Sequence, residues 1–330
     1  MEAERCAILS RRAEALHLIR RFFRRLGYLE LDTPLLAAQL IPESSLEVFR
    51  TRGARGGGAS TELYLIPSPE LWMKRLLCAG CGSLFQLCHC FRNHEPESPY
   101  HQPEFTMLEW YTVGAGYLDS MGIMERLLAF LLRRLGLGPI LSYRGRRLDC
   151  RAPFLRLSMA EAFRDALGLE LAELDSLQAI GRKARELDVP TGPDDSWADL
   201  FHKLFLTFVE PRLPSDRPLL LFDFPAAVRT LARRKAGTPW AERWELYLAG
   251  IELANCYSEA TEPEQIEAFF SAQGEAKKAA LEPHRIDWEL KDKLQRGLPP
   301  CSGAALGVDR LLMILFDQDS VGKVNVFGLS

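Results

Sequence analysis

Two arginines stand in sequence settings that would let them hold a phosphorylated ligand. Arg92 follows a strand-like run at 84–91, and Arg310 begins an amphipathic helix after the glycine-spaced segment GAALG. A guanidinium is a planar fork that matches phosphate or carboxylate oxygens in bidentate fashion. Taken alone, each arginine would be a surface or salt-bridged residue. Their meaning therefore depends on the segments around them.

Two glutamates, Glu245 and Glu252, lie in the segment ERWELYLAGIELAN. A tight turn around Leu248–Gly250 predicts that they stand nearly opposite one another on adjoining strands. Two neighbouring carboxylates repel unless a cation lies between them, and Mg²⁺ bridging phosphates suits such a pair. The alternative is a pair of solvated strand carboxylates.

The composition describes an ordinary globular chain of 330 residues, 47% hydrophobic and 26% charged. Lys and Arg number 41 and Asp and Glu 44, so the net charge of −3 lacks the basic surplus of a dedicated nucleic-acid binder. The N-terminus has no signal-peptide pattern, and no apolar run approaches 18 residues. We therefore expect a cytoplasmic protein without a membrane span, whose eight cysteines are mostly free thiols.

Four of the cysteines could suggest zinc. Cys78 and Cys81 form a C-x₂-C pair, and Cys88 and Cys90 follow within SLFQLCHCFR. Structural zinc sites take ligands that converge from turns, whereas this second pair alternates like a strand and shares one face. We expect buried thiols that pack as small hydrophobes.

Periodicity predicts the elements that must position the charged residues. Apolar spacing predicts strands separated by short turns more often than by helices, which favours an antiparallel sheet flanked by helices, an α+β fold. The glycine-rich stretch at 51–60 is expected to be a mobile loop, and about 115–215 a helical insertion between halves of the sheet. The expected helices cover 4–26, 69–79, 117–136, 263–280 and 285–295, and the expected strands cover 62–66, 84–91, 103–113, 218–225, 242–248 and 251–257, followed by a strand-to-helix unit at 301–316.

Three segments in order resemble motifs 1, 2 and 3 of class II aminoacyl-tRNA synthetases. They are LGYLELDTP, CFRNHEPESPYHQPEFTMLEWY and GAALGVDRLLMILF. The resemblance implies one catalytic domain over 1–330, homodimerisation, and formation of an acyl-adenylate from ATP. Fixed cations must then face the charge of the transition state, so Arg92 would clamp the α-phosphate and the substrate carboxylate, and Arg310 the γ-phosphate. Mg²⁺ would lie at Glu245 and Glu252.

A narrower resemblance covers the chain from residue 5 onwards. The segments SPELWMKRLL, HQPEFTMLEWY and GIELANCYSEA are similar to lysyl-tRNA synthetases, and more so to their paralogues, the elongation factor P–(R)-β-lysine ligases. This resemblance assigns the amino-acid site to Ser68, Pro69, Glu70, Glu109, Tyr111 and Glu259. It assigns the ATP contacts to Arg92, Asn93, Gln102, Phe105 (stacking on adenine), Glu252, Leu253 and Gly307. Buried carboxylates suit a substrate with two ammonium groups.

Two features favour the ligases over the synthetases. No anticodon-binding module fits before the first helix, so we expect no tRNA partner. Ala305 stands where lysyl-tRNA synthetases carry glycine and the ligases alanine, which is consistent with a preference for (R)-β-lysine. The predicted reaction activates (R)-β-lysine and transfers it to a lysine of elongation factor P. The alternatives are a truncated lysyl-tRNA synthetase-like enzyme that aminoacylates tRNA or another amine, and a non-catalytic paralogue.

The sequence departs from the family pattern in the motif 2 loop and beside the amino-acid site. FRNHE places His94 before Glu95, and Glu95 is expected to take the adenine side, with His94 as the alternative. Gln102 replaces the commoner asparagine and lengthens the reach of its amide. Cys256 replaces a glycine, and its side chain could narrow the pocket or change which lysine isomer fits.

Overall fold

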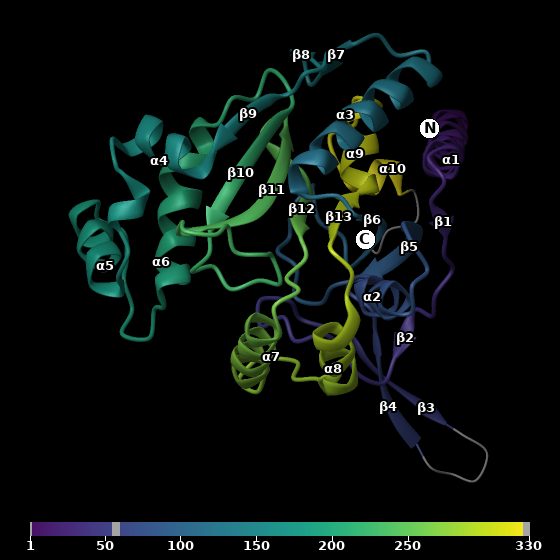
Figure 1. The fold of residues 1–330 in the computed structure, drawn as a ribbon. Coiled ribbons are helices and arrows are strands. Elements are labelled where there is room, and N and C mark those ends of the chain that lie inside the picture. The colour runs from purple at the N-terminus through teal and green to yellow at the C-terminus, as the bar shows by residue number, and fades with distance from the viewer. Residues whose placement is uncertain (1, 55–59, 326–330) are drawn as a thin grey trace.

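The computed structural model describes residues 2–54 and 60–325, and its centre is a sheet of eight strands in the order β1-β5-β6-β13-β12-β11-β10-β9 (Figure 1). All neighbours are antiparallel except the two edge pairs, β1 with β5 and β9 with β10. The strands run over Leu29–Glu30 (β1), Leu84–Phe91 (β5), Glu104–Val113 (β6), Leu155–Ser158 (β9), Leu219–Pro225 (β10), Trp240–Leu248 (β11), Ile251–Ser258 (β12) and Cys301–Gly307 (β13). The expected α+β class with an antiparallel sheet is confirmed.

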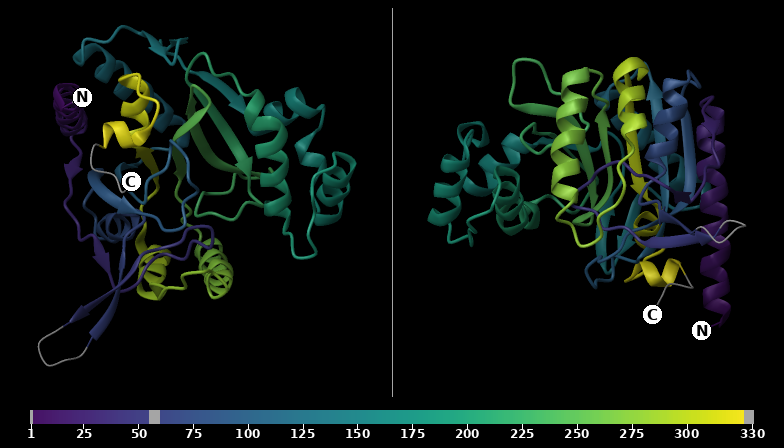
Figure 2. Two further views of the ribbon diagram at one scale, coloured as in Figure 1. Left: turned by 180° about the vertical axis from the view of Figure 1, so that it is seen from behind. Right: turned by 90° about the horizontal axis from the view of Figure 1, so that it is seen from below.

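Helices cover the two faces of this sheet, and three of them, α2, α7 and α8, lie side by side (Figure 2). The helices are Glu2–Arg25 (α1), Glu70–Cys78 (α2), Tyr117–Arg134 (α3), Met159–Leu167 (α4), Leu177–Glu186 (α5), Trp197–Leu204 (α6), Pro263–Lys277 (α7), Trp288–Gly297 (α8), Val308–Leu315 (α9) and Val321–Val324 (α10). Helices α1, α3 and α9 share one apolar core with the central strands, while α2, α7 and α8 belong to a second.

The alternation of side chains along each central strand separates a structural face from a functional one. On β6, Leu108 and Trp110 are fully buried in the core shared with α1 and α3. Met107, Glu109 and Tyr111 point to the opposite face, because successive side chains of a strand point to opposite sides. This second face is where polar residues of β6, β12 and β13 line two cavities.

The segment expected to be a helical insertion is mixed. It contains α3, α4, α5 and α6, but also the hairpin strands Ile140–Tyr143 (β7) and Arg146–Asp149 (β8), together with the edge strand β9. Periodicity missed these strands because each has only four residues. Helices α4, α5 and α6 bury a third apolar core beyond β10 at one end of the sheet (Figure 1).

The glycine-rich stretch is also different from the expectation at its two ends. Strands Arg50–Ala54 (β3) and Ser60–Leu65 (β4) pair with each other, and β4 pairs with Leu36–Ala37 (β2). The expectation of a loop over 51–60 was therefore wrong for residues 51–54 and 60, where cross-strand pairing stabilises an extended backbone; residues 55–59 lie outside the described part of the chain.

Within the described residues, no helix has the length and apolar character needed to cross a membrane. All eight cysteines are free thiols, and the Sγ atoms of Cys88 and Cys90 lie 3.8 Å apart. Residues 2–54 and 60–325 contain no group of three or more His, Cys, Asp or Glu side chains placed to hold a metal ion.

Candidate active site

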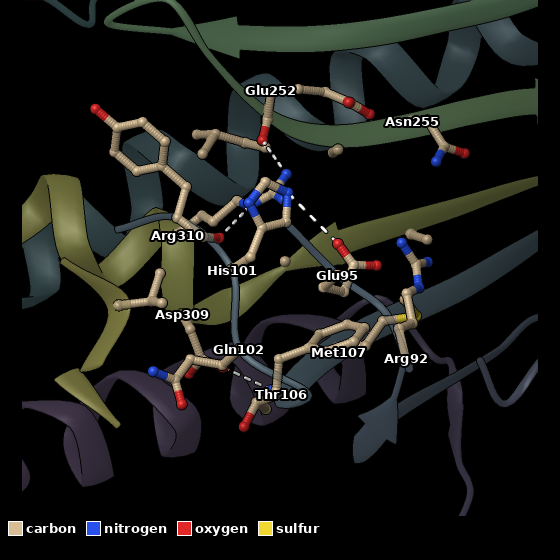
Figure 3. A pocket seen from close by; sticks show the side chains of 17 residues that line it. Arg92, Glu95, His101, Gln102, Thr106, Met107, Glu252, Asn255, Asp309 and Arg310 are labelled. Carbon is tan, nitrogen blue, oxygen red and sulfur yellow. Dashed lines mark hydrogen bonds and ion pairs between the residues drawn. The ribbon is translucent and has the colours of Figure 1, made fainter. Parts of the chain in front are cut away.

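Two adjoining cavities open on the functional face of the sheet. We call the first the arginine cavity; its walls include Arg92, Glu95, His101, Gln102, Phe105, Glu252, Gly307 and Arg310 (Figure 3). We call the second the carboxylate cavity; its walls include Glu43, Ser68, Glu70, Glu109, Tyr111 and Tyr257. Four residues, Arg92, Met107, Asn255 and Ala305, line both, so the cavities meet at Arg92.

Arg92 is held at the end of β5 and has an uncommitted guanidinium. Its backbone N–H donates to the carbonyl of Pro103 over 2.9 Å, which fixes the strand end beside β6. The guanidinium carbon lies 5.2 Å from the centre of the Phe105 ring. The buried Nε has no hydrogen-bond partner among the described residues. A buried donor without a partner is costly, and an anionic ligand in either cavity would satisfy it.

Arg310 enters the arginine cavity from the first turn of α9. Its Nε donates to the carbonyl of Tyr100 over 3.0 Å, and its Nη1 donates to the carbonyl of Glu252 over 3.1 Å. Both partners are neutral backbone groups. They fix the orientation of the guanidinium without neutralising its charge, so Arg310 remains able to attract an anion.

The two glutamates of the β11–β12 hairpin approach one another but are not directly opposite. Ala249 and Gly250 have φ angles of 58° and 80° and form a two-residue turn. This turn pairs Leu248 with Ile251 and Tyr247 with Glu252, and after a register irregularity Glu245 pairs with Asn255. The two glutamates, expected nearly opposite one another on adjoining strands, lie on adjoining strands with Glu245 two positions from the residue that pairs with Glu252.

Glu252 and Glu245 nevertheless affect each other. Burial and then repulsion from Glu245 raise the pKa of Glu252 to about 7, while Arg310 lowers it. Within the described residues the Glu252 carboxylate makes no hydrogen bond or ion pair, whereas Glu245 accepts from Arg243 (2.6 Å) and from the Tyr247 hydroxyl (3.0 Å). Glu252 lines the arginine cavity and Glu245 does not.

A pair of this kind fits Mg²⁺. Magnesium is commonly held by one or two protein carboxylates together with phosphates and water. Glu252 supplies an unpartnered carboxylate facing the cavity, and Glu245 a second, partnered one behind it.

The rear wall of the arginine cavity depends on a buried ion pair from α1. The Arg12 guanidinium contacts the Asp309 carboxylate and donates to the Thr106 hydroxyl over 2.7 Å. The other oxygen of Asp309 accepts from the backbone N–H of Thr106, also over 2.7 Å. Asp309 precedes Arg310, so this network fixes the start of α9 against β6.

Glu109 occupies the centre of the carboxylate cavity. The Ser68 hydroxyl donates to one of its oxygens (2.7 Å) and the Tyr111 hydroxyl to the other (2.8 Å). Burial and then the neighbouring Glu70 raise the pKa of Glu109 to about 8, although both hydroxyls favour its charged form. Burial of this carboxyl therefore favours its protonated form.

A completely buried lysine joins two further carboxylates. Lys74, one helical turn after Glu70 on α2, lies with its Nζ 2.6 Å from Glu70 and 2.7 Å from Glu259. These two carboxylates raise the pKa of Lys74 well above its ordinary value in spite of its burial. The Tyr257 hydroxyl also donates to Glu70, over 3.1 Å. Lys74 therefore supplies a positive charge that balances Glu70 and Glu259.

The far end of the carboxylate cavity contains an unsatisfied acceptor. Glu259 is 1% exposed, and its Oε1 has no hydrogen-bond partner among the described residues. A Cβ added at Gly303 would lie 2.8 Å from this oxygen and 2.5 Å from the Tyr111 ring. The absence of a side chain at Gly303 therefore leaves room for a cationic group of a ligand to reach Glu259.

The structure brings most residues expected from sequence to these walls. Those on the walls are Ser68, Glu70, Arg92, Glu95, Gln102, Phe105, Glu109, Tyr111, Glu252, Leu253, Ala305, Gly307 and Arg310. Pro69 instead forms the N-cap of α2, Glu259 lies behind Gly303, and Glu245 lies behind Glu252. Asn93 donates from its backbone to Glu47 and lines neither cavity.

His94 is exposed, with a φ angle of 54°, and lines neither cavity. The histidine that does line the arginine cavity is His101, whose Nε2 lies 3.6 Å from Glu95. Burial and then the charge of Arg310 lower its pKa, while Glu95 raises it. Cys256 is fully buried on the face towards α3 and does not line the carboxylate cavity, so its side chain does not narrow that cavity.

Sequence reasoning missed several wall residues. Asn255, Tyr257 and His101 line a cavity and Lys74 pairs with the wall residue Glu70; all four lie within motif segments, and only their chemical type could have identified them. Glu43 lies in an irregular segment with no motif, and nothing in its local sequence indicated that it reaches a cavity.

Comparisons with known proteins agree with this geometry. The family model "tRNA synthetases class II (D, K and N)" matches residues 1–330. A Vibrio atlanticus protein named elongation factor P–(R)-β-lysine ligase is 36% identical over 324 residues, which cover 97% of this chain and 94% of the relative. Proteins of the same name from Salmonella arizonae and Yersinia enterocolitica are 38% and 37% identical over equal shares.

Proposed function

The chain belongs to the class II tRNA synthetase family and, within it, to the elongation factor P–(R)-β-lysine ligases, and on that premise we propose that it activates (R)-β-lysine with ATP and transfers it to a lysine of elongation factor P. As a member it is an ATP-dependent ligase. The observation that carries the proposal is the junction, at Arg92, of a cavity that holds two arginines and a cavity lined by three carboxyl groups.

The first half-reaction would take place at this junction. The carboxylate oxygen of the amino acid attacks the α-phosphorus of ATP, the bond to the β-phosphate breaks, and pyrophosphate leaves with the bonding electrons. Arg92 reaches both cavities and can hold the substrate carboxylate and the α-phosphate together. Arg310, oriented by two backbone carbonyls, would bind the γ-phosphate.

ATP would lie in the arginine cavity, with the Phe105 ring as the surface for the adenine and Gln102 and Glu95 at its polar edge. Mg²⁺, when bound, would neutralise phosphate charge, with Glu252 as a ligand and Glu245 in support. Among the described residues the Glu252 carboxylate has no hydrogen bond or ion pair and lines the arginine cavity, so it is available to such an ion.

The amino acid would lie in the carboxylate cavity. A diammonium substrate brings two positive charges and one carboxylate; the cavity is lined by three carboxyl groups and Arg92, with the Lys74–Glu259 ion pair beside it. With Arg92 paired to the substrate carboxylate, the remaining groups carry an excess of negative charge that suits two ammonium groups. Neutral amino acids would leave these carboxylates buried without a counter-ion.

In the second half-reaction the ε-amine of the acceptor lysine attacks the carbonyl carbon of the adenylate. The carbon–oxygen bond to the phosphate breaks and AMP leaves with the electron pair. The nitrogen gives up one proton before attack and one as the amide forms, so a group near Arg92 or the solvent must accept them.

We propose further that the chain acts in the cytoplasm as one catalytic domain and as a homodimer. Leu26, Leu29, Leu35 and Leu36 are each 37–48% exposed around the end of α1, β1 and the start of β2. A second copy covering these leucines would remove them from water.

The test of the proposed function is ATP–pyrophosphate exchange with (R)-β-lysine and with L-lysine, followed by transfer to purified elongation factor P. Exchange stimulated more strongly by (R)-β-lysine, with ATP-dependent labelling of elongation factor P and none of tRNA, is the expected result. Exchange with L-lysine alone and labelling of tRNA would favour the synthetase-like alternative, and absence of exchange with both amino acids would overturn the proposal.

A further inference from the structure

The segment between β2 and β3 places an additional carboxylate, Glu43, on the wall of the carboxylate cavity. Hydrogen bonds to Lys277 and to residues 281 and 282 hold this segment in place. The buried ammonium of Lys277 donates to the carbonyl of Leu46 and lies 3.3 Å from Glu47, and Glu47 accepts from the N–H groups of Leu281 (3.1 Å) and Glu282 (2.9 Å). Glu47 also bridges to Asn93, next to Arg92. Glu43 is thereby held near the junction of the two cavities.

The register of the sheet shows how far the other polar groups of the carboxylate cavity lie from its junction with the arginine cavity. Residues that pair across β6, β13 and β12 form rows, which we count along β13 from Gly307 towards Cys301. The first row contains Met107. The second contains Ala305, Glu109 and Asn255, and the third contains Gly303, Tyr111 and Tyr257. Glu259 follows, with its N–H bonded to Cys301. Each row is about 7 Å from the next in an antiparallel sheet. Glu259 therefore lies farthest from the junction.

Glu43 lines the carboxylate cavity together with Glu70 and Arg92, the residue at the junction. Burial and then the charge of Glu70 raise the pKa of Glu43 to about 7, while Arg92 lowers it. Its own carboxylate makes no hydrogen bond or ion pair with the residues that the structure describes, whereas Glu70 is partnered by Lys74 and Tyr257 and Glu109 by Ser68 and Tyr111. The cavity thus holds a free carboxylate and a second one together with the arginine that would bind the substrate carboxylate.

A substrate carboxylate at Arg92 places its nearest amino group within the first few ångströms of the cavity, and its far ammonium one or two rows deeper. We propose that Glu43 is a specificity-determining residue: together with Glu70 it binds the ammonium group nearest the substrate carboxylate, while Glu109, Tyr111 and Glu259 serve the distal ammonium. This inference rests on the proposed function, because it presumes a diammonium substrate.

The experiment compares three ligands that differ only in the near amino group. They are (R)-β-lysine, L-lysine and 6-aminohexanoate, which keeps the carboxylate and the distal ammonium but has no near amine. KM in ATP–pyrophosphate exchange is measured for the first two, and the inhibition constant against (R)-β-lysine exchange for the third.

Glu43→Gln is expected to raise the KM for (R)-β-lysine by roughly 10- to 100-fold, the loss typical of a hydrogen bond to a charged group. The inhibition constant of 6-aminohexanoate is expected to stay within about threefold, because that ligand has no near ammonium to lose a partner. Glu43→Asp, which keeps the charge, should recover part of the loss. Glu62→Gln, on the neighbouring β4 and outside both cavities, is the matched control and should change neither constant.

Three outcomes would overturn the inference. The KM for (R)-β-lysine could be unchanged, or both constants could worsen equally, which would indicate a general disturbance of the cavity. Alternatively, exchange could be normal while transfer to elongation factor P alone is slowed, which would make Glu43 a proton acceptor for the second step. The wild-type enzyme separates the two proposals. If it supports no exchange with either lysine, the proposed function fails. If it supports exchange, but Glu43→Gln changes the constants for (R)-β-lysine and 6-aminohexanoate equally, only this inference fails.

Discussion

The arginine cavity and the carboxylate cavity share one face of one sheet, yet the first leaves arginine side chains available to an anion and the second gathers buried carboxyl groups. In the first, Arg310 is oriented by neutral carbonyls and Arg92 has a free Nε, so positive charge is left available. In the second, the carboxyl groups of Glu43, Glu70 and Glu109 line the walls, and among the described residues the buried Lys74 pairs only with Glu70 and Glu259. Burial and then the charge of Glu70 therefore raise the pKa values of Glu43 and Glu109. One end of the site is thus ready for an anion and the other for a cation.

The difference shows how each end is stabilised in the absence of ligand. Cations can be positioned by backbone dipoles with little loss of charge, whereas buried carboxylates must either be paired or become protonated. Lys74 pairs two of them, and proton uptake accommodates others. Ligand binding is therefore expected to change protonation at the carboxylate end more than at the arginine end.

The largest effect is expected from removing the one cation that serves both ends. Arg92→Ala should lower the rate of ATP–pyrophosphate exchange by roughly 1000-fold, because both the substrate carboxylate and the α-phosphate lose their shared partner. Arg92→Lys should recover little, since an ammonium cannot form the bidentate contact. Arg217→Ala, at an exposed surface pair, is the control. A fall of less than tenfold would contradict the junction role of Arg92.

The next effect tests whether Lys74 is a structural counter-ion. Lys74→Met should lower the free energy of unfolding by about 3 kcal/mol at pH 7.5, because Glu70 and Glu259 lose their buried partner. The loss should shrink towards pH 5, where the carboxylates accept protons. Urea unfolding at both pH values measures it. Equal destabilisation at the two pH values would mean that lost packing, rather than unpaired charge, is responsible.

A smaller effect should be confined to the carboxylate end. Gly303→Ala adds a methyl group where it would meet the Tyr111 ring and Glu259, so the KM for (R)-β-lysine should rise by about tenfold. The KM for ATP should change by less than about twofold, because Gly303 does not line the arginine cavity. Steady-state exchange with each substrate varied in turn separates the two. An equal rise of both constants would show that the two ends are not independent.

The smallest expected effect is a pH dependence of ligand affinity at the carboxylate cavity. Glu109 has an ordinary pKa of 4.5 and one of about 8 in the ligand-free fold. Between these values the unfolded chain loses the proton first, so stability without ligand falls as pH rises. A diammonium ligand favours the charged carboxylate, so its affinity should rise about threefold or more from pH 6.5 to 7.5, with proton release.

Calorimetric titration in buffers of different ionisation enthalpy measures that release. Glu109→Gln should reduce it, whereas a Glu245→Gln control, which lies outside the carboxylate cavity, should not. Affinity that is flat between pH 6.5 and 7.5 in the wild type would contradict a protonated Glu109.

Much of the fold could be predicted because its signals are local. Strand β5 was expected at 84–91 and lies there, and the hairpin of β11 and β12, the helix at α1 and the β13–α9 unit are confirmed. The missed features are the short strands β2, β3, β7, β8 and β9, of two to five residues, and the parallel pairing of β9 with β10. A four-residue strand has too few alternations to identify, and its partner lies some sixty residues further along the chain.

The candidate site divides in the same way. Residues in the motif segments, such as Arg92, Glu109 and Arg310, could be named because motif order and spacing identify them. The hairpin register that separates Glu245 from Glu252 depends on the φ angles of Ala249 and Gly250, which the sequence indicates only as a turn.

The sequence by itself determined the family, the antiparallel sheet and the motif residues, because each is written in contiguous segments whose periodicity or residue type is visible. The three-dimensional arrangement alone shows that Glu43 and Glu70 line one cavity, that Lys74 joins Glu70 to Glu259, and that the two cavities meet at Arg92. These are contacts between segments as many as 185 residues apart, such as Lys74 and Glu259. They arise because the sheet register and the anchored segment after β2 bring distant side chains to one face, which no local pattern encodes.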